Sequence, residues 1–363
     1  MSTSCRTSGA GLAGRAAGIA AASLLWLASQ PCGSVATPAT ERPLLGLAVN
    51  LPEKAGLSTF SNDLLAVRGL EVRAITLSRK WSELEPSPGV YQTDELQRAV
   101  VHLGAMGFRI LLTIQTIDTN NLTMPPDLAN RPFDSPETVR RLRALLARVV
   151  PAVERHVPWL AIGNEVDVYL AAHPASVEPY ARLAEAGREE ICRRVPGIRV
   201  GVTVTYDGLR AQRAMVERLE RSMDVRCLTY YPLKAGFTVK ALAQVGADFE
   251  TMVSGAGGRP VLLQEVGCPA SEQNGSSEAY QAAFVDAVFA AAERHRGRLA
   301  MLTFFMLYDF PDSLVTTLVD YYRLKDARFR AYLATLGLRK SDGTPRAAWR
   351  AFERNARAWR DRP

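Results

Sequence analysis

Histidine and cysteine are scarce in this chain, whose 363 residues include four His and five Cys. No two cysteines form a C-x-x-C pair, and no His/Cys cluster has the spacing of metal ligands, which argues against a structural zinc site. The small number of His gives little support to catalysis by His. We therefore expect a protein that uses neither a bound metal nor a cofactor.

Charge of one sign does not dominate either. The chain has 44 Lys and Arg against 37 Asp and Glu, and the resulting formal net charge of +7 is spread along it. Such a balance is compatible with acidic partners but does not require nucleic acid. The composition, 47% hydrophobic and 22% charged, favours a folded globular protein over a disordered one. We expect a monomer that does not bind nucleic acid.

The first 36 residues contain two Arg and no acidic residue. The apolar run Ala16–Ala28 has 13 residues, fewer than the about 20 of a membrane-spanning helix. This run and the small residues Ser34–Ala36 fit the core and the cleavage site of a secretory signal peptide. We predict a signal peptide over 1–36, a mature domain over 37–363, and secretion to the extracellular space or periplasm without membrane attachment. The alternative is an uncleaved membrane anchor.

Cleavage at that point removes Cys5 and Cys32. The mature chain keeps three cysteines, Cys192, Cys227 and Cys268. An odd number allows at most one internal disulfide, and the sequence leaves open which pair forms it and whether any does.

Eight short apolar runs alternate with amphipathic segments along the mature chain. They are rich in Val, Ile and Leu and bounded by Gly or Pro, which is typical of strands buried on both faces. Eight strands, each followed by a helix, predict an α/β fold with a single (β/α)8 TIM barrel. The alternative is an open doubly wound sheet, but Asn50–Glu53 follows the first strand where a glycine-rich phosphate loop would stand. The predicted strands are Leu44–Val49, Glu71–Leu77, Arg109–Gln115, Pro158–Gly163, Ile198–Thr205, Val225–Tyr231, Pro260–Val266 and Leu299–Leu307.

Two glutamates stand where an apolar strand gives way to its loop. Glu165 ends the fourth predicted strand, in the sequence LAIGNE, and Glu265 ends the seventh, in LLQEVG. The active sites of barrel enzymes gather at these strand ends. A carboxylate there is costly unless it is paired, so a bond to an Arg explains each Glu alone. Together they fit retaining glycoside hydrolysis, which needs two carboxyls about 5–5.5 Å apart.

Four motifs, in this order along the chain, resemble those of clan A glycoside hydrolases, which are retaining (β/α)8 enzymes. The resemblance covers most of residues 44–353, and with YYP over Tyr230–Pro232 it is strongest to endo-β-1,4-galactanases. It implies a retaining O-glycoside hydrolase with its acid/base on strand four and its nucleophile on strand seven. The motifs are WSELEPSPGVY over Trp81–Tyr91, GNE over Gly163–Glu165, EVGCP over Glu265–Pro269, and a closing segment from Gly337 to Trp349.

The same resemblance implies roles for individual residues. Glu165 becomes the acid/base and Glu265 the nucleophile. A turn-forming Asn and aromatic residues that pack the barrel explain several of the other positions without a substrate. The implied substrate-binding residues are Asn164 at the sugar 2-hydroxyl, Tyr231 beside the nucleophile, Gln115 at the end of strand three, and Trp81 and Tyr308 as surfaces for sugar rings.

The chain departs from the clan's pattern in two places. Many members have an Arg on strand two that supports the nucleophile, and here Arg73 lies early on that strand and Arg79 late. Many also have a Trp at the end of strand eight, where this chain reads FFMLYD over Phe304–Asp309. The support role is therefore unassigned and the substrate is open.

We predict a secreted retaining β-glycosidase that hydrolyses a β-linked polysaccharide or oligosaccharide by double displacement, in carbohydrate metabolism and polysaccharide degradation. A carbohydrate-binding pseudoenzyme on the same barrel and a cell-wall transglycosylase with the same two Glu are the alternatives. Close carboxyls resist ionising together, so they titrate in two coupled steps. We expect Glu265 to take the lower step and Glu165 the higher.

Overall fold

The structure is a computed structural model that describes residues 42–53 and 55–361. The predicted signal peptide and its cleavage site lie outside the described residues. All pairings between the barrel strands are parallel, and only the short β4 adds an antiparallel pair, to β3. The strands are β1 Leu44–Leu47, β2 Ala74–Lys80, β3 Arg109–Asp118, β4 Asn121–Leu122, β5 Trp159–Asn164, β6 Arg199–Gly201, β7 Thr203–Thr205, β8 Arg226–Tyr230, β9 Val261–Val266 and β10 Leu299–Phe304.

One interrupted strand closes the sheet into a barrel. The strand order is β6-β5-β3-β2-β1-β10-β9-β8-β7, so β6 and β7 stand at its two ends. These two are consecutive in the chain and separated only by Val202, so together they complete the ring as one strand. Eight parallel strands that alternate with helices form a (β/α)8 barrel, and the predicted fold class is confirmed.

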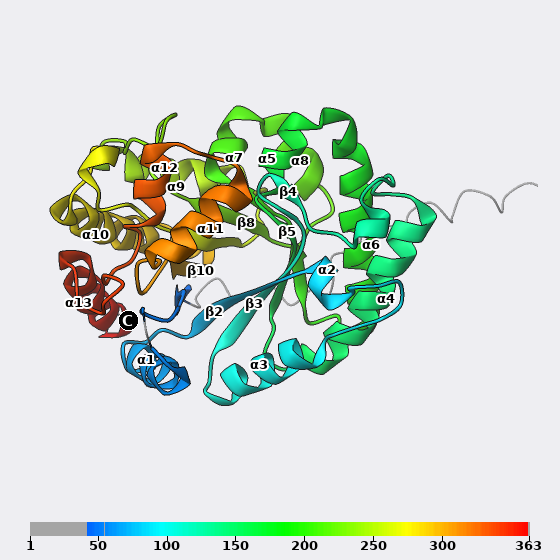
Figure 1. The fold of residues 1–363 in the computed structure, drawn as a ribbon, viewed down its shortest axis with the longest axis horizontal. Coiled ribbons are helices and arrows are strands. Elements are labelled where there is room, and N and C mark those ends of the chain that lie inside the picture. Colours follow the sequence, from blue (N-terminus) through cyan, green and yellow to red (C-terminus); the bar gives the residue numbers. More distant parts are fainter. Residues whose placement is uncertain (1–41, 54, 362–363) are drawn as a thin grey trace, which may run out of the picture. The chain divides into compact units, whose positions relative to one another are not determined.

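Eight of the helices in the described ranges cover the outside of the barrel (Figure 1). Helix α4 shows how the sequence starts one of them, because the Ser135 hydroxyl accepts a hydrogen bond of 3.3 Å from the Thr138 backbone N–H and Pro136 follows at the first helical position. In the described ranges, no helix combines the length and apolarity needed to cross a membrane. The helices are α1 Leu57–Gly69, α3 Asp94–Ala105, α4 Pro136–Val153, α6 Val177–Arg194, α8 Arg213–Glu220, α9 Val245–Ser254, α10 Glu278–Arg294 and α13 Ala347–Asp361.

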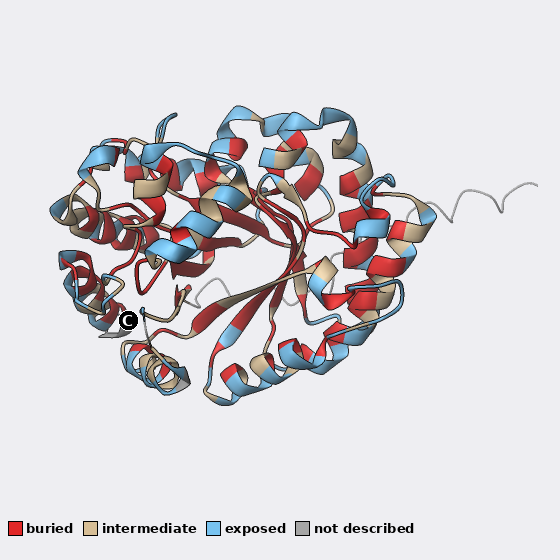
Figure 2. Ribbon diagram, viewed as in Figure 1, coloured by how far each residue is buried: buried red, intermediate tan, exposed pale blue. Residues whose placement is uncertain are grey.

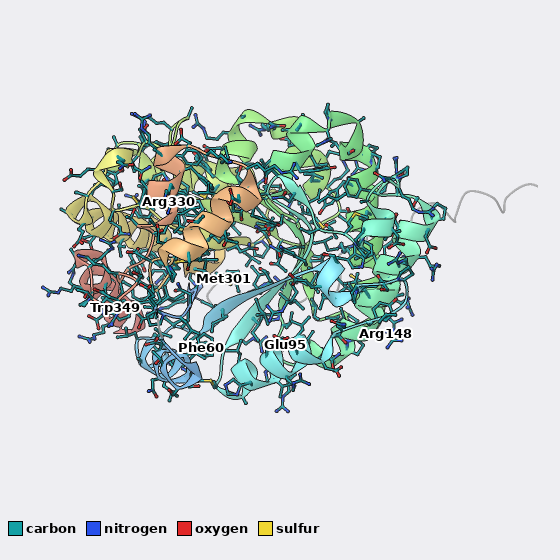
Figure 3. The ribbon with its side chains drawn as sticks, viewed as in Figure 1. Phe60, Glu95, Arg148, Met301, Arg330 and Trp349 are labelled. Atoms are coloured by element: carbon teal, nitrogen blue, oxygen red, sulfur yellow. The ribbon has the colours of Figure 1, made fainter. Side chains whose placement is uncertain are left out.

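The core has a layer inside the ring of strands and another around it. Leu111, Leu262 and Met301 belong to the small inner cluster, and alternate positions on the same strands face the helices in the large outer cluster. Figure 2 shows the strands buried and the outer helix faces exposed, and Figure 3 shows Met301 among the strands. Cys227 and Cys268 are free thiols, and both are buried.

Shorter helices occupy the loops between strands and outer helices. Helix α11 follows β10 (orange in Figure 1) and ends against the β3–β4 loop, where Asn120 and Asn121 donate to the backbone carbonyls of Tyr322 and Tyr321 at 2.7 and 3.1 Å. The segment after β10 therefore reaches across to the end of β3. These loops contain the short helices α2 Trp81–Leu84, α5 Val166–Ala172, α7 Tyr206–Ala211 and α12 Ala327–Leu333, the longer α11 Asp312–Tyr322, and 3₁₀ turns at Pro126–Leu128, Pro174–Ser176, Leu242–Gln244 and Glu272–Asn274.

Candidate active site

Glu165 stands where β5 turns into α5. The turn is tight, because Gly163 has φ +84° and Glu165 has φ +46°, both in the left-handed region. A Cβ on Gly163 would lie 2.2 Å from the Tyr180 hydroxyl, so only glycine fits there without a shift. The half-buried carboxylate of Glu165 accepts hydrogen bonds from the hydroxyls of Thr229 at 2.7 Å and Thr119 at 2.8 Å. The GNE motif thus places a carboxylate in the barrel mouth on a strained backbone.

Glu265 lies near the end of β9 and accepts hydrogen bonds from two sides. The Tyr231 hydroxyl donates to one carboxylate oxygen at 2.7 Å, and the Gln264 amide donates to the other at 3.5 Å. The neighbouring Tyr230 points elsewhere, since its hydroxyl donates to Asp248 at 2.9 Å. The structure therefore brings Tyr231, the residue preferred from the sequence, to Glu265.

Gln264 connects the strand ends beneath the two glutamates. Its amide oxygen accepts hydrogen bonds from Thr113 at 3.2 Å and Thr203 at 2.8 Å, and its N–H donates to the Asn164 side-chain oxygen at 2.7 Å. Asn164 in turn donates to Asp118 at 3.1 Å. Every group in this chain of bonds is buried, so the side chain of Asn164 is held in one orientation beside Glu165.

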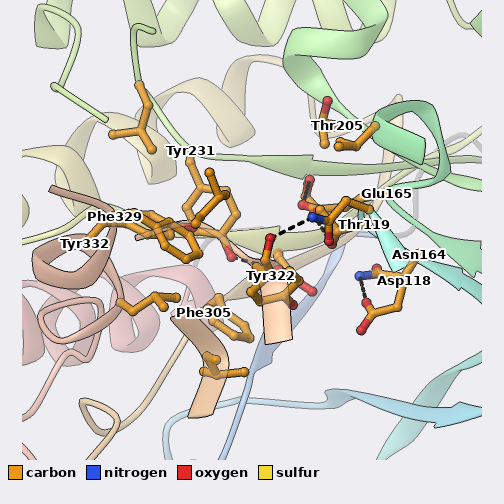
Figure 4. A pocket seen from close by; sticks show the side chains of 18 of the residues that line it. Asp118, Thr119, Asn164, Glu165, Thr205, Tyr231, Phe305, Tyr322, Phe329 and Tyr332 are labelled. Atoms are coloured by element: carbon orange, nitrogen blue, oxygen red, sulfur yellow. Dashed lines mark hydrogen bonds between the residues drawn. The ribbon is translucent and has the colours of Figure 1, made fainter. Parts of the chain in front are cut away.

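A pocket of about 480 Å³ opens over the two glutamates. Glu165, Glu265, Asn164, Tyr231 and Gln115 all line it, so five of the seven predicted site residues share one cavity. Figure 4 shows two faces, with Asp118, Asn164 and Glu165 on one and the rings of Tyr231, Phe305, Phe329 and Tyr332 on the other. Gln115 joins the polar face by donating to Asp118 at 3.0 Å. Across the described ranges, no three His, Cys, Asp or Glu side chains are placed to hold a metal ion.

The surroundings of the two glutamates favour their neutral forms. Burial raises the pKa of Glu165 even though two threonine hydroxyls donate to it. Burial and the negative charge of Glu165 raise the pKa of Glu265 to about 8. Among the described residues that line the pocket there is no Lys, Arg or His to offset these effects. The pair therefore keeps a proton at neutral pH.

Both glutamates have raised pKa values, and the expectation that Glu265 takes the lower of the two steps stays a prediction. The donors Tyr231 and Gln264 lower the pKa of Glu265, but by less than burial and the charge of Glu165 raise it. The hydrogen-bond donor Tyr231 could be predicted from the sequence. Only the structure shows that the described residues lining the pocket include no Lys, Arg or His. Arg73 bonds Glu71 and the Arg68 carbonyl, and Arg79 bonds Glu95 and the Ser78 carbonyl.

Two predicted substrate-binding residues lie elsewhere. Trp81 is fully buried and its indole N–H donates to Glu85 at 2.9 Å, so its ring packs the core and offers no surface to a sugar. Tyr308 is also buried, and its hydroxyl donates to Asp63 at 3.0 Å. Neither residue lines the pocket. In both cases the aromatic ring is buried in the core and its polar atom has its hydrogen-bond partner there.

Sequence reasoning missed several residues that surround the glutamates. Thr119 and Thr229 give Glu165 its donors, and Gln264 connects the network. Gln264 carried a readable signal, because a glutamine inside the apolar run VLLQEV needs partners when buried. Tyr322 and Tyr332 come from α11 and α12, whose path over the pocket no local pattern predicts.

No family model matches this chain, and no curated protein does. Solved structures do match it over most of its length. One is the exo-β-1,4-mannosidase Op5Man5 from Opitutaceae bacterium strain TAV5, with TM-score 0.68 and 17% identity over 88% of this chain. This chain spans only 59% of that protein's length.

Two further matches have related folds. A GH5_18 protein from Streptomyces cattleya, in complex with Manβ1-4GlcNAc, has TM-score 0.70 and 18% identity, over 88% of this chain and 82% of its own. A family 39 glycoside hydrolase from Bacteroides cellulosilyticus WH2 has TM-score 0.61 and 15% identity, over 88% of this chain and 64% of its own. At such identities the likeness establishes the barrel fold. None of these three is a galactanase, so that finer resemblance stays a prediction.

Proposed function

We propose that this protein is a secreted, monomeric retaining β-glycosidase that acts on a β-linked oligosaccharide or polysaccharide. The observation that carries the proposal is the placement of Glu165 and Glu265, from the ends of β5 and β9, in one pocket. The fold shared with named glycoside hydrolases supports it. A retaining mechanism requires the two carboxyls about 5–5.5 Å apart.

The proposed reaction has two steps. In the first, the carboxylate of Glu265 attacks the anomeric carbon, and protonated Glu165 gives its proton to the leaving oxygen as the glycosidic bond breaks. In the second, Glu165 takes a proton from water, the water oxygen attacks the anomeric carbon, and the ester to Glu265 breaks. The reaction needs the shared proton on Glu165. The Tyr231 and Gln264 donors favour the ionised form of Glu265 that this requires.

Asn164 and Asp118 contribute to binding in this proposal. Asn164 is fixed by Gln264 and Asp118, so it can meet a sugar hydroxyl without first reorganising. A hydroxyl contact at the sugar 2-position strengthens as the ring acquires oxocarbenium character. Asp118 and Gln115 offer further partners on the same face.

One observation favours a second candidate, a carbohydrate-binding pseudoenzyme. No cation faces Glu265 among the described lining residues, and its pKa is raised to about 8. Such a group is ionised in few molecules at acidic pH and attacks poorly. The two candidates differ in turnover, since a pseudoenzyme binds a β-glycan without cleaving it.

Azide rescue of two variants tests the proposal. With activated aryl β-glycosides, Glu265→Ala should lose turnover and regain it with azide, giving a product of inverted configuration. Glu165→Ala should form the glycosyl-enzyme and stall, and azide should release a product of retained configuration. Rescue with these stereochemistries exchanged would refute the assigned roles. If the wild-type protein binds a β-glycan but does not hydrolyse it, the enzyme hypothesis is refuted and the pseudoenzyme hypothesis is supported.

A further inference from the structure

The pocket wall opposite the polar face is apolar. Beside Glu265, the ring of Tyr231 packs edge to face on Phe305 and Tyr332, with centroids 6.3 and 5.4 Å apart. Phe237 lies 5.8 Å from Tyr332. The wall thus begins at the catalytic pair and continues along α11 and α12, as Figure 4 shows for its labelled rings.

Two apolar residues of the pocket lining are open to solvent. Leu324, which follows α11, is 40% exposed, and Val168, on α5, is 37% exposed. Both residues line the pocket. Apolar surface in contact with water is unfavourable, so a ligand that covers these two residues with apolar groups gains from the contact.

The two faces of the pocket differ in the hydrogen-bond partners that they offer to a ligand. A sugar ring carries several hydroxyls, and each needs a partner when it leaves water. Gln115, Asp118 and Asn164 supply partners on the polar face, whereas Phe305, Leu318 and Leu324 on the apolar wall supply none. The Tyr231 hydroxyl on that wall already donates to Glu265. The sugar that is attacked therefore fits the polar face, and a second sugar on the apolar wall would find few partners for its several hydroxyls.

The charge of the pocket limits the ligand further. Its ionisable carboxyl groups are Asp118, Glu165, Asp207 and Glu265, and the described lining residues include no basic side chain. A uronate, sulfate or phosphate group on the ligand would meet only like charge. The ligand must therefore be free of anionic groups.

We propose that this pocket takes β-glycosides whose leaving group is an uncharged apolar aglycone, an alkyl chain or an aromatic ring, held against the wall of Phe305, Leu318, Leu324 and Tyr332. This rests on the proposed function, since it names the substrate class of the same site. The glycone occupies the polar face with Asn164, and the aglycone oxygen receives the proton of Glu165.

A homologous series of alkyl glycosides tests the proposal. Methyl, propyl and hexyl β-glycosides of glucose, mannose, galactose and N-acetylglucosamine differ in chain length while the leaving oxygen keeps the same chemistry. A fully buried methylene is worth about a fourfold gain in affinity. We expect kcat/KM on the accepted sugar to rise about twofold or more per methylene, and the hexyl glycoside to exceed the β-1,4-linked glucoside of that sugar.

Variants at exposed positions locate the effect. Leu324→Asp should lower kcat/KM for the hexyl glycoside by about tenfold, because it places a carboxylate against the alkyl chain. The matched control is Leu65→Asp on α1, where the side chain is 61% exposed and does not line the pocket. It should leave every value unchanged. A flat series in wild type, or equal effects of the two variants, would overturn the proposal.

4-Nitrophenyl β-glycosides of the same four sugars distinguish a failure of this proposal from a failure of the proposed glycosidase function. If these substrates are hydrolysed but kcat/KM does not rise along the alkyl series, the proposed glycosidase activity is supported and the apolar aglycone is refuted. If neither these substrates nor any β-glycan is hydrolysed, the proposed glycosidase activity is refuted. Calorimetric binding of the hexyl and methyl glycosides to Glu165→Gln then decides, since equal affinities overturn the apolar wall as a binding surface and tighter hexyl binding supports it.

Discussion

Two pairs of glutamates in this barrel differ in what faces them, since Glu85 and Glu220 are buried against arginines and Glu165 and Glu265 are half-buried in the pocket. Glu220 accepts two hydrogen bonds from the Arg226 guanidinium, at 2.8 and 2.6 Å, and both side chains are 1% exposed. Glu85 accepts from Arg141 at 3.0 Å in the same way. Glu165 and Glu265 have only hydroxyl and amide donors.

The difference indicates which carboxylates serve the fold. A buried carboxylate that accepts hydrogen bonds from a guanidinium holds two elements of the fold together. Glu165 and Glu265 have no guanidinium beside them, and their pKa values are raised. The proton that they retain makes the fold less stable at higher pH, but it provides an acid and a base in one site. Four predictions test this comparison.

The largest effect is expected on activity. Glu265→Gln should lower kcat at least about a thousandfold, because the nucleophile is removed while the shape of the side chain is kept. Glu220→Gln should retain kcat per folded molecule, since Glu220 lies outside the pocket. Initial rates on the accepted glycoside, corrected for folded protein, are the measurement. Comparable losses in both variants would erase the distinction between the two kinds of glutamate.

Stability should respond in the opposite way. Glu220→Gln should lower the free energy of unfolding by about 3–5 kcal/mol, because Arg226 is left as a buried charge without its partner. Denaturant unfolding at pH 7 measures this. The double variant Glu220→Gln with Arg226→Met should recover much of the loss. A loss below about 1 kcal/mol would mean that the ion pair is not the stabilising element.

Glu265→Gln should stabilise the protein, and only at higher pH. Burial raises the pKa of Glu265 from 4.5 to about 8, so the native state binds more protons than the unfolded chain between these values, and stability falls as pH rises through them. The variant has no proton to lose. Its Tm should match wild type at pH 4 and exceed it by at least about 2 °C at pH 9. A lower Tm at pH 9 would show that the charged form is favoured in the fold.

The smallest effect concerns the pH profile. The Tyr231 hydroxyl lowers the pKa of Glu265 by donating to its carboxylate. Tyr231→Phe should therefore move the acid limb of kcat/KM to higher pH, by up to about one unit. Tyr230→Phe is the matched control, because the Tyr230 hydroxyl bonds Asp248. An unmoved limb in Tyr231→Phe would remove Tyr231 from the support of the nucleophile.

The barrel could be predicted from the sequence because the spacing of apolar residues and the positions of the strand ends are local properties. Each predicted strand overlaps an observed one, and Glu165 and Glu265 follow from their places at strand ends. Trp81 was wrongly expected at the pocket, since nothing local reveals that its indole bonds Glu85. The rings of Tyr322 and Tyr332 depend on how α11 and α12 fold over the mouth, which is a matter of tertiary packing.

Trapping the glycosyl-enzyme tests the central claim most directly. 2-Deoxy-2-fluoro glycosides with a good leaving group, made from glucose, mannose and galactose, should form a stable ester with the protein on the accepted sugar. Mass spectrometry of the intact chain should then show one added glycosyl group, and peptide mapping should place it on Glu265. A label on Glu165, or substrate hydrolysis with no label on either glutamate, would contradict the assignment of the two carboxylates.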